Sequence, residues 1–259
     1  MGTSPSNWGK EVSSRPISYI DYPFVNVPYL TSGKRVFQDS TFVGLASIDS
    51  TSKIYYTTDG SDPKENKNSY SHSIIFNKTG VLKSVCFNNG IYSKVVTSNF
   101  NKIPLGRSIT LNTEYHHNYT GGGALGLIDG IKGTMNFHTD AWQGYEGNDL
   151  NAVVDLGKIE KISLIDASFL QNTGSWIFYP AEINYYVSTD GKKFTKVFET
   201  KNNDDQAHSE NGIKDFDKKL DGVKARYVKV IAKNVGECPA WHVAAGSKAW
   251  LFVDEISIK

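Results

Sequence analysis

The 259-residue sequence has little of several features that would indicate a particular chemistry. It holds two cysteines, Cys86 and Cys238, which form no C-x-x-C motif and lie too far apart in the chain for us to expect a disulfide between them. It has no run of about 18 apolar residues, so we expect no membrane insertion. Its net charge of +1 provides no general attraction for nucleic acid.

Sequence signatures of catalysis are also missing. The chain has no G-x-S-x-G, no H-E-x-x-H and no phosphate-binding glycine motif. It lacks the alternating strands and helices of a (β/α)₈ barrel. Glycoside hydrolysis usually needs two carboxyl groups about 5 to 9 Å apart, and Asp140 with Glu146 is no more specific a pair than any two loop acids. We therefore expect no enzymatic activity in this chain.

The strand pattern is the positive signal. Short runs of β-branched and aromatic residues recur about every ten residues, separated by Gly, Asn, Asp and Ser, which predicts an all-β fold. The length suits two domains, and Pro104 marks a plausible boundary. We predict domains at 23–103 and 104–259, with the polar residues 1–22 as a linker or the end of a neighbouring segment.

One segment of the first domain is specific enough to suggest a family. The sequence IYYTTDGSDP (residues 54–63), followed by VLKSVCFNNGIYSKV (81–95), resembles the C-terminal domain of chitobiases and β-hexosaminidases. Its Asp-Gly pair supplies a turn that tolerates positive φ. The resemblance implies a small immunoglobulin-like β-sandwich with no catalytic residues.

Five segments of the second domain point to another family by their order. They are LGLIDGIKGT, VVDLGKIEKISLI, YYVSTDGKKF, ARYVKVIAKN and WLFVDEISI. This order is similar to the discoidin or F5/8 type C fold, which includes carbohydrate-binding module family 32. The resemblance covers residues 104–259 and implies a discoidin-like jelly-roll β-sandwich.

The second resemblance also implies a structural calcium ion. Asp129 and Thr134 match the Asp-Gly…Thr loop of the family, and Glu255 matches its acidic residue at the start of the last strand. Calcium prefers six to eight oxygen ligands gathered by a tight loop. Adjacent strand residues face opposite sides, so we expect that Asp254 and Glu255 do not both point at this site. The alternative for Asp129 is an ordinary turn residue.

A lectin-like site needs an aromatic platform for the apolar face of a sugar and a few polar groups for its hydroxyls. Three loops carry such residues, and we expect Trp250 to belong to the core. The predicted ligand-binding residues are His138, Trp142, Glu146, Trp176, Trp241 and His242. The alternative for each tryptophan is packing, and for each histidine an ordinary loop position.

Together the resemblances imply the non-catalytic, carbohydrate-binding C-terminal region of a secreted, extracytoplasmic glycoside hydrolase of family 20, similar to β-N-acetylhexosaminidases. The implied partners are glycans ending in Gal, GalNAc or GlcNAc and the catalytic domain of the same parent chain. The alternatives are a discoidin-like adhesion module for a protein partner and an appendage of an α-L-fucosidase. Anionic membranes are disfavoured because residues 104–259 carry 17 Lys and Arg against 20 Asp and Glu.

Overall fold

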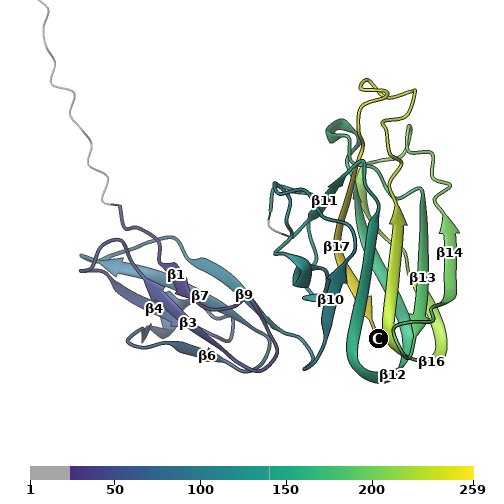
Figure 1. The fold of residues 1–259 in the computed structure, drawn as a ribbon. Coiled ribbons are helices and arrows are strands. Elements are labelled where there is room, and N and C mark those ends of the chain that lie inside the picture. The colour runs from purple at the N-terminus through teal and green to yellow at the C-terminus, as the bar shows by residue number, and fades with distance from the viewer. Residues whose placement is uncertain (1–23, 140) are drawn as a thin grey trace, which may run out of the picture.

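The computed structural model describes residues 24–139 and 141–259, and it shows two β-sandwiches side by side (Figure 1). The predicted all-β fold class is confirmed. Three short helical turns interrupt the strands: α1 (Pro63–Asn66), η1 (Ala124–Ile128) and η2 (Thr173–Ser175). The predicted linker at 1–22 lies outside the described residues.

The described residues of the first sandwich form nine strands. They are β1 (Tyr29–Ser32), β2 (Val36–Phe37), β3 (Thr41–Ala46), β4 (Lys53–Thr57), β5 (Asn68–Ser69), β6 (Ile74–Phe76), β7 (Gly80–Asn88), β8 (Ile91–Tyr92) and β9 (Val96–Lys102). One sheet has the order β1-β3-β6, and the other has the order β2-β9-β7-β4-β5 with β8 paired to β7. Both sheets contribute to a single apolar core, which includes Val43, Leu82 and Phe100.

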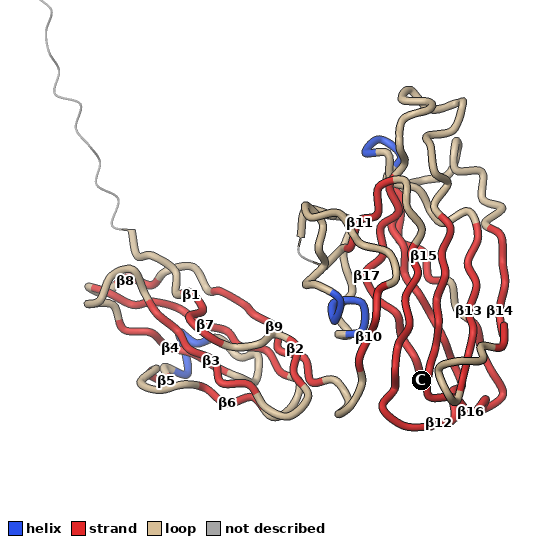
Figure 2. Tube along the Cα trace, viewed as in Figure 1, coloured by secondary structure: helices blue, strands red, loops and turns tan. Residues whose placement is uncertain are grey.

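The second sandwich is larger, and its strands form one continuous hydrogen-bonded network (Figure 2). They are β10 (Ser108–Leu111), β11 (Gln143–Glu146), β12 (Leu150–Gln171), β13 (Glu182–Ser188), β14 (Thr195–Lys201), β15 (Gly212–Asp215), β16 (Lys218–Lys233) and β17 (Trp250–Ile258). The main order is β11-β17-β12-β16-β13-β14, and β10 and β15 also pair with β12. Among the described residues, no helix is long and apolar enough to cross a membrane.

Strand β12 organises this sandwich because different parts of it pair with different strands. Residues 150–155 pair with β10 and β16, whereas residues 165–171 pair with β17 and β15. The register shifts after Asp155, where the strand turns. The Arg226 guanidinium clamps this turn by donating from Nε and Nη2 to the two Asp155 carboxylate oxygens, at 2.8 and 2.9 Å.

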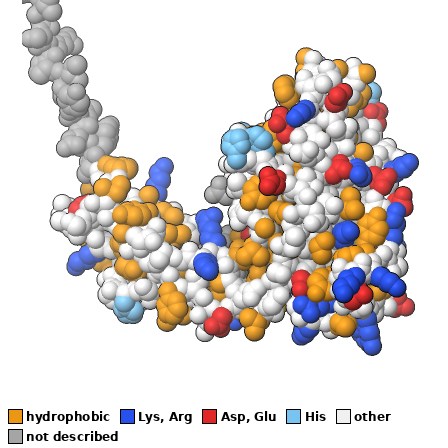
Figure 3. All heavy atoms as spheres, in the orientation of Figure 1, with side chains coloured by type: hydrophobic (Ala, Val, Ile, Leu, Met, Phe, Trp, Pro, Cys, Tyr) orange, Lys and Arg blue, Asp and Glu red, His pale blue; other side chains and the backbone are white. Residues whose placement is uncertain are grey.

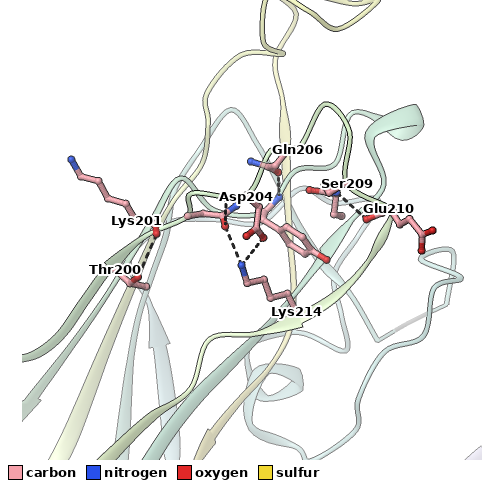
Figure 4. A network of polar contacts seen from close by, with 10 residues as sticks. Thr200, Lys201, Asp204, Gln206, Ser209, Glu210 and Lys214 are labelled. Atoms are coloured by element: carbon pink, nitrogen blue, oxygen red, sulfur yellow. Dashed lines mark hydrogen bonds and ion pairs between the residues drawn. The ribbon is translucent and has the colours of Figure 1, made fainter.

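Polar side chains join the connection between β14 and β15 to neighbouring parts of the second sandwich (Figure 4). In the connection between β14 and β15, the Asp204 carboxylate accepts from Lys214 Nζ on β15. Gln206 Oε1 accepts from the Tyr179 backbone amide in the connection between β12 and β13, at 2.9 Å. The polar stretch around Asp204 is exposed and serves to hold these connections together.

The two sandwiches meet through apolar and polar contacts. Val36 and Ile103 pack against the core of the second sandwich. Asn101, at the end of β9, donates from Nδ2 to the Asp129 carbonyl at 2.7 Å, and Gln38 bonds the linker backbone at Arg107. The first sandwich therefore contacts the loop that carries one of the predicted metal ligands.

Candidate functional site

A shallow pocket of about 270 Å³ lies beside the first residues of β17, where three connections of the second sandwich come together. Its lining residues, called the aromatic pocket below, are Tyr119, Phe137, His138, Ser175, Ile177, Trp250 and Phe252. Tyr119 comes from the connection between β10 and η1, His138 from that between η1 and β11, and Ser175 from η2. Of these residues, the sequence had predicted only His138 as a ligand contact.

Trp250 and Phe252 form one wall of the pocket. They are two residues apart on β17, so their side chains share one face of the sheet. Tyr119 packs against both rings, with centroids 5.4 Å from Trp250 and 4.7 Å from Phe252. Gly144 on β11 makes this possible, because a Cβ there would lie 2.6 Å from the Phe252 ring and 3.0 Å from Tyr119 Cβ. Any larger residue at 144 would displace these rings.

Trp142 lies beneath the pocket and is not a ligand contact, which corrects the prediction from sequence. Its side chain is 1% exposed and packs with Leu170, Ile177 and Phe252 in a small separate core. Its indole Nε1–H donates to the Thr134 carbonyl at 2.9 Å. A buried indole satisfies its one polar group in this way, so Trp142 supports the pocket from below.

Histidines supply polar groups around the aromatic rings. The His138 side chain is exposed and lies against Phe137, with ring centroids 4.3 Å apart. His116 meets Trp250 edge-on at 5.1 Å and stacks on His117 at 4.3 Å. Figure 3 shows histidine side chains on the face of the larger sandwich that turns toward the smaller one. The site combines apolar ring surface with imidazole donors and acceptors.

Glu146 and Trp176 lie at the margin of the aromatic pocket. Glu146 is half-buried and directly opposite Trp250 in the pairing of β11 with β17, so both side chains share a face. Trp176 is 39% exposed, and its carbonyl accepts from the Trp250 amide at 2.8 Å, beside the pocket residue Ser175. Their predicted role as ligand contacts stays a prediction.

Trp241 and His242 belong to a different part of the surface. The Trp241 ring is 48% exposed and rests edge-on against Phe178 at 6.0 Å, outside the aromatic pocket. His242 is 8% exposed, its Nε2–H donates to the Thr173 carbonyl at 2.8 Å, and its Nδ1 accepts from the Ala244 amide at 3.1 Å. Because both ring nitrogens are engaged, the prediction that His242 binds a ligand hydroxyl is wrong.

The predicted metal ligands lie around residues 129–134, called the acidic loop below. The Gly130 amide donates to Glu255 Oε2 at 2.9 Å, and the Gly133 amide donates to the Asp254 carboxylate. Both carboxylates come from β17 and reach the same loop. Asp129 and Glu255 thus lie close together, and their role as metal ligands stays a prediction.

The expectation that Asp254 and Glu255 point to opposite sides is wrong, and the reason is a β-bulge. In the pairing of β12 with β17, Ser168 lies opposite Glu255 but Phe169 lies opposite Val253. Asp254 is therefore an extra residue in its strand. A bulge interrupts the strict alternation of side chains, which lets two consecutive acids face the acidic loop.

Burial makes these carboxylates difficult to ionise. It raises the pKa of Asp129 to about 6, although the Ile131 amide donates to Asp129 Oδ1 at 2.7 Å and acts in the opposite direction. Burial, together with the nearby Asp129 and Asp254 carboxylates, raises the pKa of Glu255 to about 8. The pKa of Asp254 is raised by the same cause. Negative charge in this region is costly unless a cation accompanies it.

The oxygens of this region suit a hard cation. Asp254 Oδ1 is buried without a hydrogen-bond partner among the described residues. Thr134 is exposed and lies with Asp129 on the wall of a larger groove. The described residues contain no three Asp, Glu, His or Cys side chains that surround a common metal position. Backbone carbonyls and water would therefore have to supply much of the coordination, as calcium readily allows.

Family comparison covers both sandwiches. The sequence model described as F5/8 type C domain matches residues 108–250. This chain belongs to the F5/8 type C domain family. A second model, described as Fn3 associated, matches residues 43–100 of the first sandwich. None of the curated proteins matches the chain.

Solved structures similar to the F5/8 type C domain include carbohydrate-binding modules. A family 32 module from Clostridium perfringens, in complex with GalNAc-β-1,3-galactose, is 19% identical with a TM-score of 0.39 and covers 59% of this chain and 94% of that one. The C-terminal domain of a chitobiase from Bacteroides fragilis is 17% identical with a TM-score of 0.39 and covers 60% and 93%.

Sequence reasoning missed much of the aromatic pocket of the F5/8 type C domain. Trp250 was expected in the core because apolar residues follow it, yet it is half-buried and lines the pocket. Tyr119 and Phe137 were not singled out. The run YHHNY at 115–119 was an available signal, because so many rings in one connection favour an exposed cluster. Nothing in the local sequence reveals that the backbone of this run forms hydrogen bonds with Gly144 on β11.

Substitution of Trp142 tests its supporting role in the F5/8 type C domain. We expect Trp142→Ala to lower the free energy of unfolding of this domain by about 3 to 5 kcal/mol, the usual cost of removing a large buried aromatic ring. Chemical denaturation followed by circular dichroism measures this loss. Trp241→Ala serves as the matched control and is expected to cost under about 1 kcal/mol. Equal costs for the two variants would contradict the assignment of Trp142 to the core.

Proposed function

We propose that the F5/8 type C domain binds carbohydrate at the aromatic pocket and that its ligands are glycans ending in Gal, GalNAc or GlcNAc. The observation that carries this proposal is the combination of an open aromatic wall with exposed histidine at its rim. Tyr119 and Trp250 present ring surface, while His138 stands beside them with its side chain exposed.

The chemistry of a sugar matches this arrangement. The C–H face of a pyranose ring is apolar and packs against an aromatic ring, and the hydroxyls around it need a few polar partners. Imidazole can donate from one nitrogen and accept at the other, so it suits a hydroxyl. A pocket of about 270 Å³ is shallow and suits one terminal sugar.

We further propose that the chain is a non-catalytic, extracytoplasmic appendage of a glycoside hydrolase of family 20, similar to β-N-acetylhexosaminidases. The Asp-Gly hairpin sequence of the first sandwich supports this parentage, as does its position directly before the F5/8 type C domain. Such an appendage would hold a glycan near the catalytic domain and raise its effective concentration without contributing catalytic groups.

Sugar titration with two pocket variants tests the binding proposal. We expect GalNAc, Gal or GlcNAc to bind with an affinity near millimolar, or roughly −4 kcal/mol. His138→Ala is expected to weaken binding about tenfold, because it removes a hydrogen-bonding partner of a hydroxyl. Trp250→Ala is expected to abolish measurable binding. Isothermal titration calorimetry measures both changes, and circular dichroism verifies that each variant is folded.

The matched control is Trp241→Ala, which removes an exposed tryptophan outside the pocket and should leave the affinity unchanged. If Trp241→Ala abolished binding and His138→Ala did not, the sugar site would lie on the loop between β16 and β17. If no glycan of a broad array bound the intact chain, the adhesion alternative would replace the carbohydrate proposal.

The purified chain is expected not to hydrolyse chromogenic N-acetylhexosaminides or fucosides. Glycoside hydrolysis usually requires two carboxyl groups beside the scissile bond, and the described residues that line the aromatic pocket include no carboxylate. A spectrophotometric assay against a buffer blank measures this. Turnover that persists through repurification would overturn the proposal.

For the acidic loop we propose a structural calcium ion held by Asp129, Thr134 and Glu255 together with loop carbonyls. The three residues offer a carboxylate, a hydroxyl and a second carboxylate, all of them hard oxygen ligands. Burial raises the pKa values of Asp129 and Glu255, and a bound cation would offset the cost of ionising both acids. When bound, the ion would neutralise these charges and join the acidic loop to β17.

The stability of the chelated protein is expected to fall as pH rises from about 4.5 to about 8. Across this window the unfolded Glu255 ionises while the folded one, with its pKa of about 8, keeps its proton, so the folded state binds more protons. Calcium is expected to raise the melting temperature by about 3 °C or more at pH 8, and by less at pH 5.5, because its ligands must be deprotonated. Differential scanning fluorimetry measures both effects.

Glu255→Gln should remove the calcium response and flatten the pH dependence, whereas the exposed control Glu114→Gln should preserve both. A melting curve that calcium and chelator leave unchanged at pH 8 would show that the acidic loop closes without a metal.

A further inference from the structure

A second and larger cavity of about 940 Å³ lies at the junction of the two sandwiches. Arg35 lines it from the first sandwich, and Lys132, Thr134, His138 and Thr139 line it from the second. We call this cavity the junction groove. Figure 3 shows Lys or Arg side chains where the two sandwiches meet. The groove is thus a composite of both domains and has a different chemical character from the aromatic pocket.

Arg35 is held in place by its backbone. Its carbonyl accepts from the Asn101 amide at 2.7 Å, and the next residue, Val36, packs against the core of the second sandwich. Its side chain is exposed and lines the groove. Among the described residues no salt bridge engages its guanidinium. A guanidinium that borders a groove and has no salt-bridge partner is available to an anionic ligand.

The other charges of the groove favour the same ligand. Lys132 adds a second cation, and its Nζ forms a salt bridge with Asp215 Oδ2 at 2.9 Å. Asp129 is the acid among the described lining residues, and the Ile131 amide donates to its Oδ1 within the acidic loop. Thr134 and Thr139 also line the groove, and the Thr139 hydroxyl already donates to the Asn136 carbonyl at 3.0 Å.

The groove and the aromatic pocket adjoin at His138, which lines both. A ligand with a terminal sugar against Tyr119 and Trp250 can therefore extend past His138 toward Arg35. The combined space exceeds what one monosaccharide requires and falls within the range of sites for larger ligands.

We propose that the junction groove binds an anionic group, a carboxylate or a sulfate ester, on the glycan whose terminal sugar occupies the aromatic pocket; this rests on the carbohydrate-binding function proposed above. Arg35 receives the anion because the planar guanidinium offers two parallel N–H donors to carboxylate or sulfate oxygens. Lys132 adds a second positive charge in the same groove. The first sandwich then contributes directly to specificity for acidic glycans.

Titration of the full chain with one neutral disaccharide and its acidic derivatives tests this proposal. The ligands are lactose, its 3′- and 6′-sulfates, and its 3′- and 6′-sialyl derivatives. At least one acidic derivative is expected to bind at least tenfold more tightly than lactose at low salt, with the advantage shrinking as salt rises. The sulfated and sialylated ligands distinguish a sulfate ester from a carboxylate as the natural anion.

Arg35→Gln is expected to reduce the ratio of the affinity for acidic glycans to that for lactose to near one. Arg35→Lys is expected to give an intermediate ratio, because it keeps the positive charge but loses the two parallel N–H donors of the guanidinium. Lys34→Gln, which removes an exposed positive charge one residue away and outside the groove, should keep the wild-type ratio. Thermal melting of each variant verifies folding.

The outcomes separate this inference from the function on which it rests. Lactose binding with no preference for any acidic derivative would overturn the anion site and leave the carbohydrate-binding proposal intact. A preference that Arg35→Gln retains would also overturn the assignment to the junction groove. Failure of neutral and acidic glycans alike would overturn the carbohydrate-binding proposal itself.

Discussion

The second sandwich depends on the contact between the acidic loop and the bulge in β17. The bulge turns Asp254 and Glu255 toward the same side, and the amides of Gly133 and Gly130 donate to them. Buried carboxylates are costly without such partners. This contact fixes the end of the acidic loop, and the segment that follows it, with Phe137 and His138, enters the aromatic pocket from that fixed point.

The aromatic pocket rests on a small core that lies beneath it. Phe252 lies both in the pocket wall and in the small core around Trp142, so ring positions at the surface are set by packing beneath them. The Trp142 indole N–H also donates a hydrogen bond to the Thr134 carbonyl, and this bond links the small core to the acidic loop. Ligand recognition on this surface is consequently sensitive to residues that no ligand touches.

The sequence predicted the strands well because their signals are local. Alternating and β-branched runs identified β4 and β6, and both resemblances depended on Asp-Gly turns whose chemistry is contained in a few residues. The order of the segments carried the second family resemblance, and this resemblance implied that Glu255 lies near the acidic loop although the two are distant in the sequence. The predictions that failed needed information that local sequence lacks. A bulge at Asp254 is a property of two paired strands, and the burial of Trp142 follows from where the Gly133 backbone lies against it.

The order of the strands has a consequence for synthesis of the chain. Strand β17 leaves the ribosome after all the other described strands, yet it lies between β11 and β12 inside the sheet, and it carries Trp250 and Glu255. Until it arrives, residues 165–170 of β12 lack their pairing with β17, and the acidic loop lacks the carboxylates that accept from its amides. The first sandwich has all of its strands much earlier and can fold during synthesis. The ligand surface of the second sandwich is therefore completed only after β17 has been synthesised, and any chain that stops before Trp250 has neither the aromatic wall nor the acidic pair.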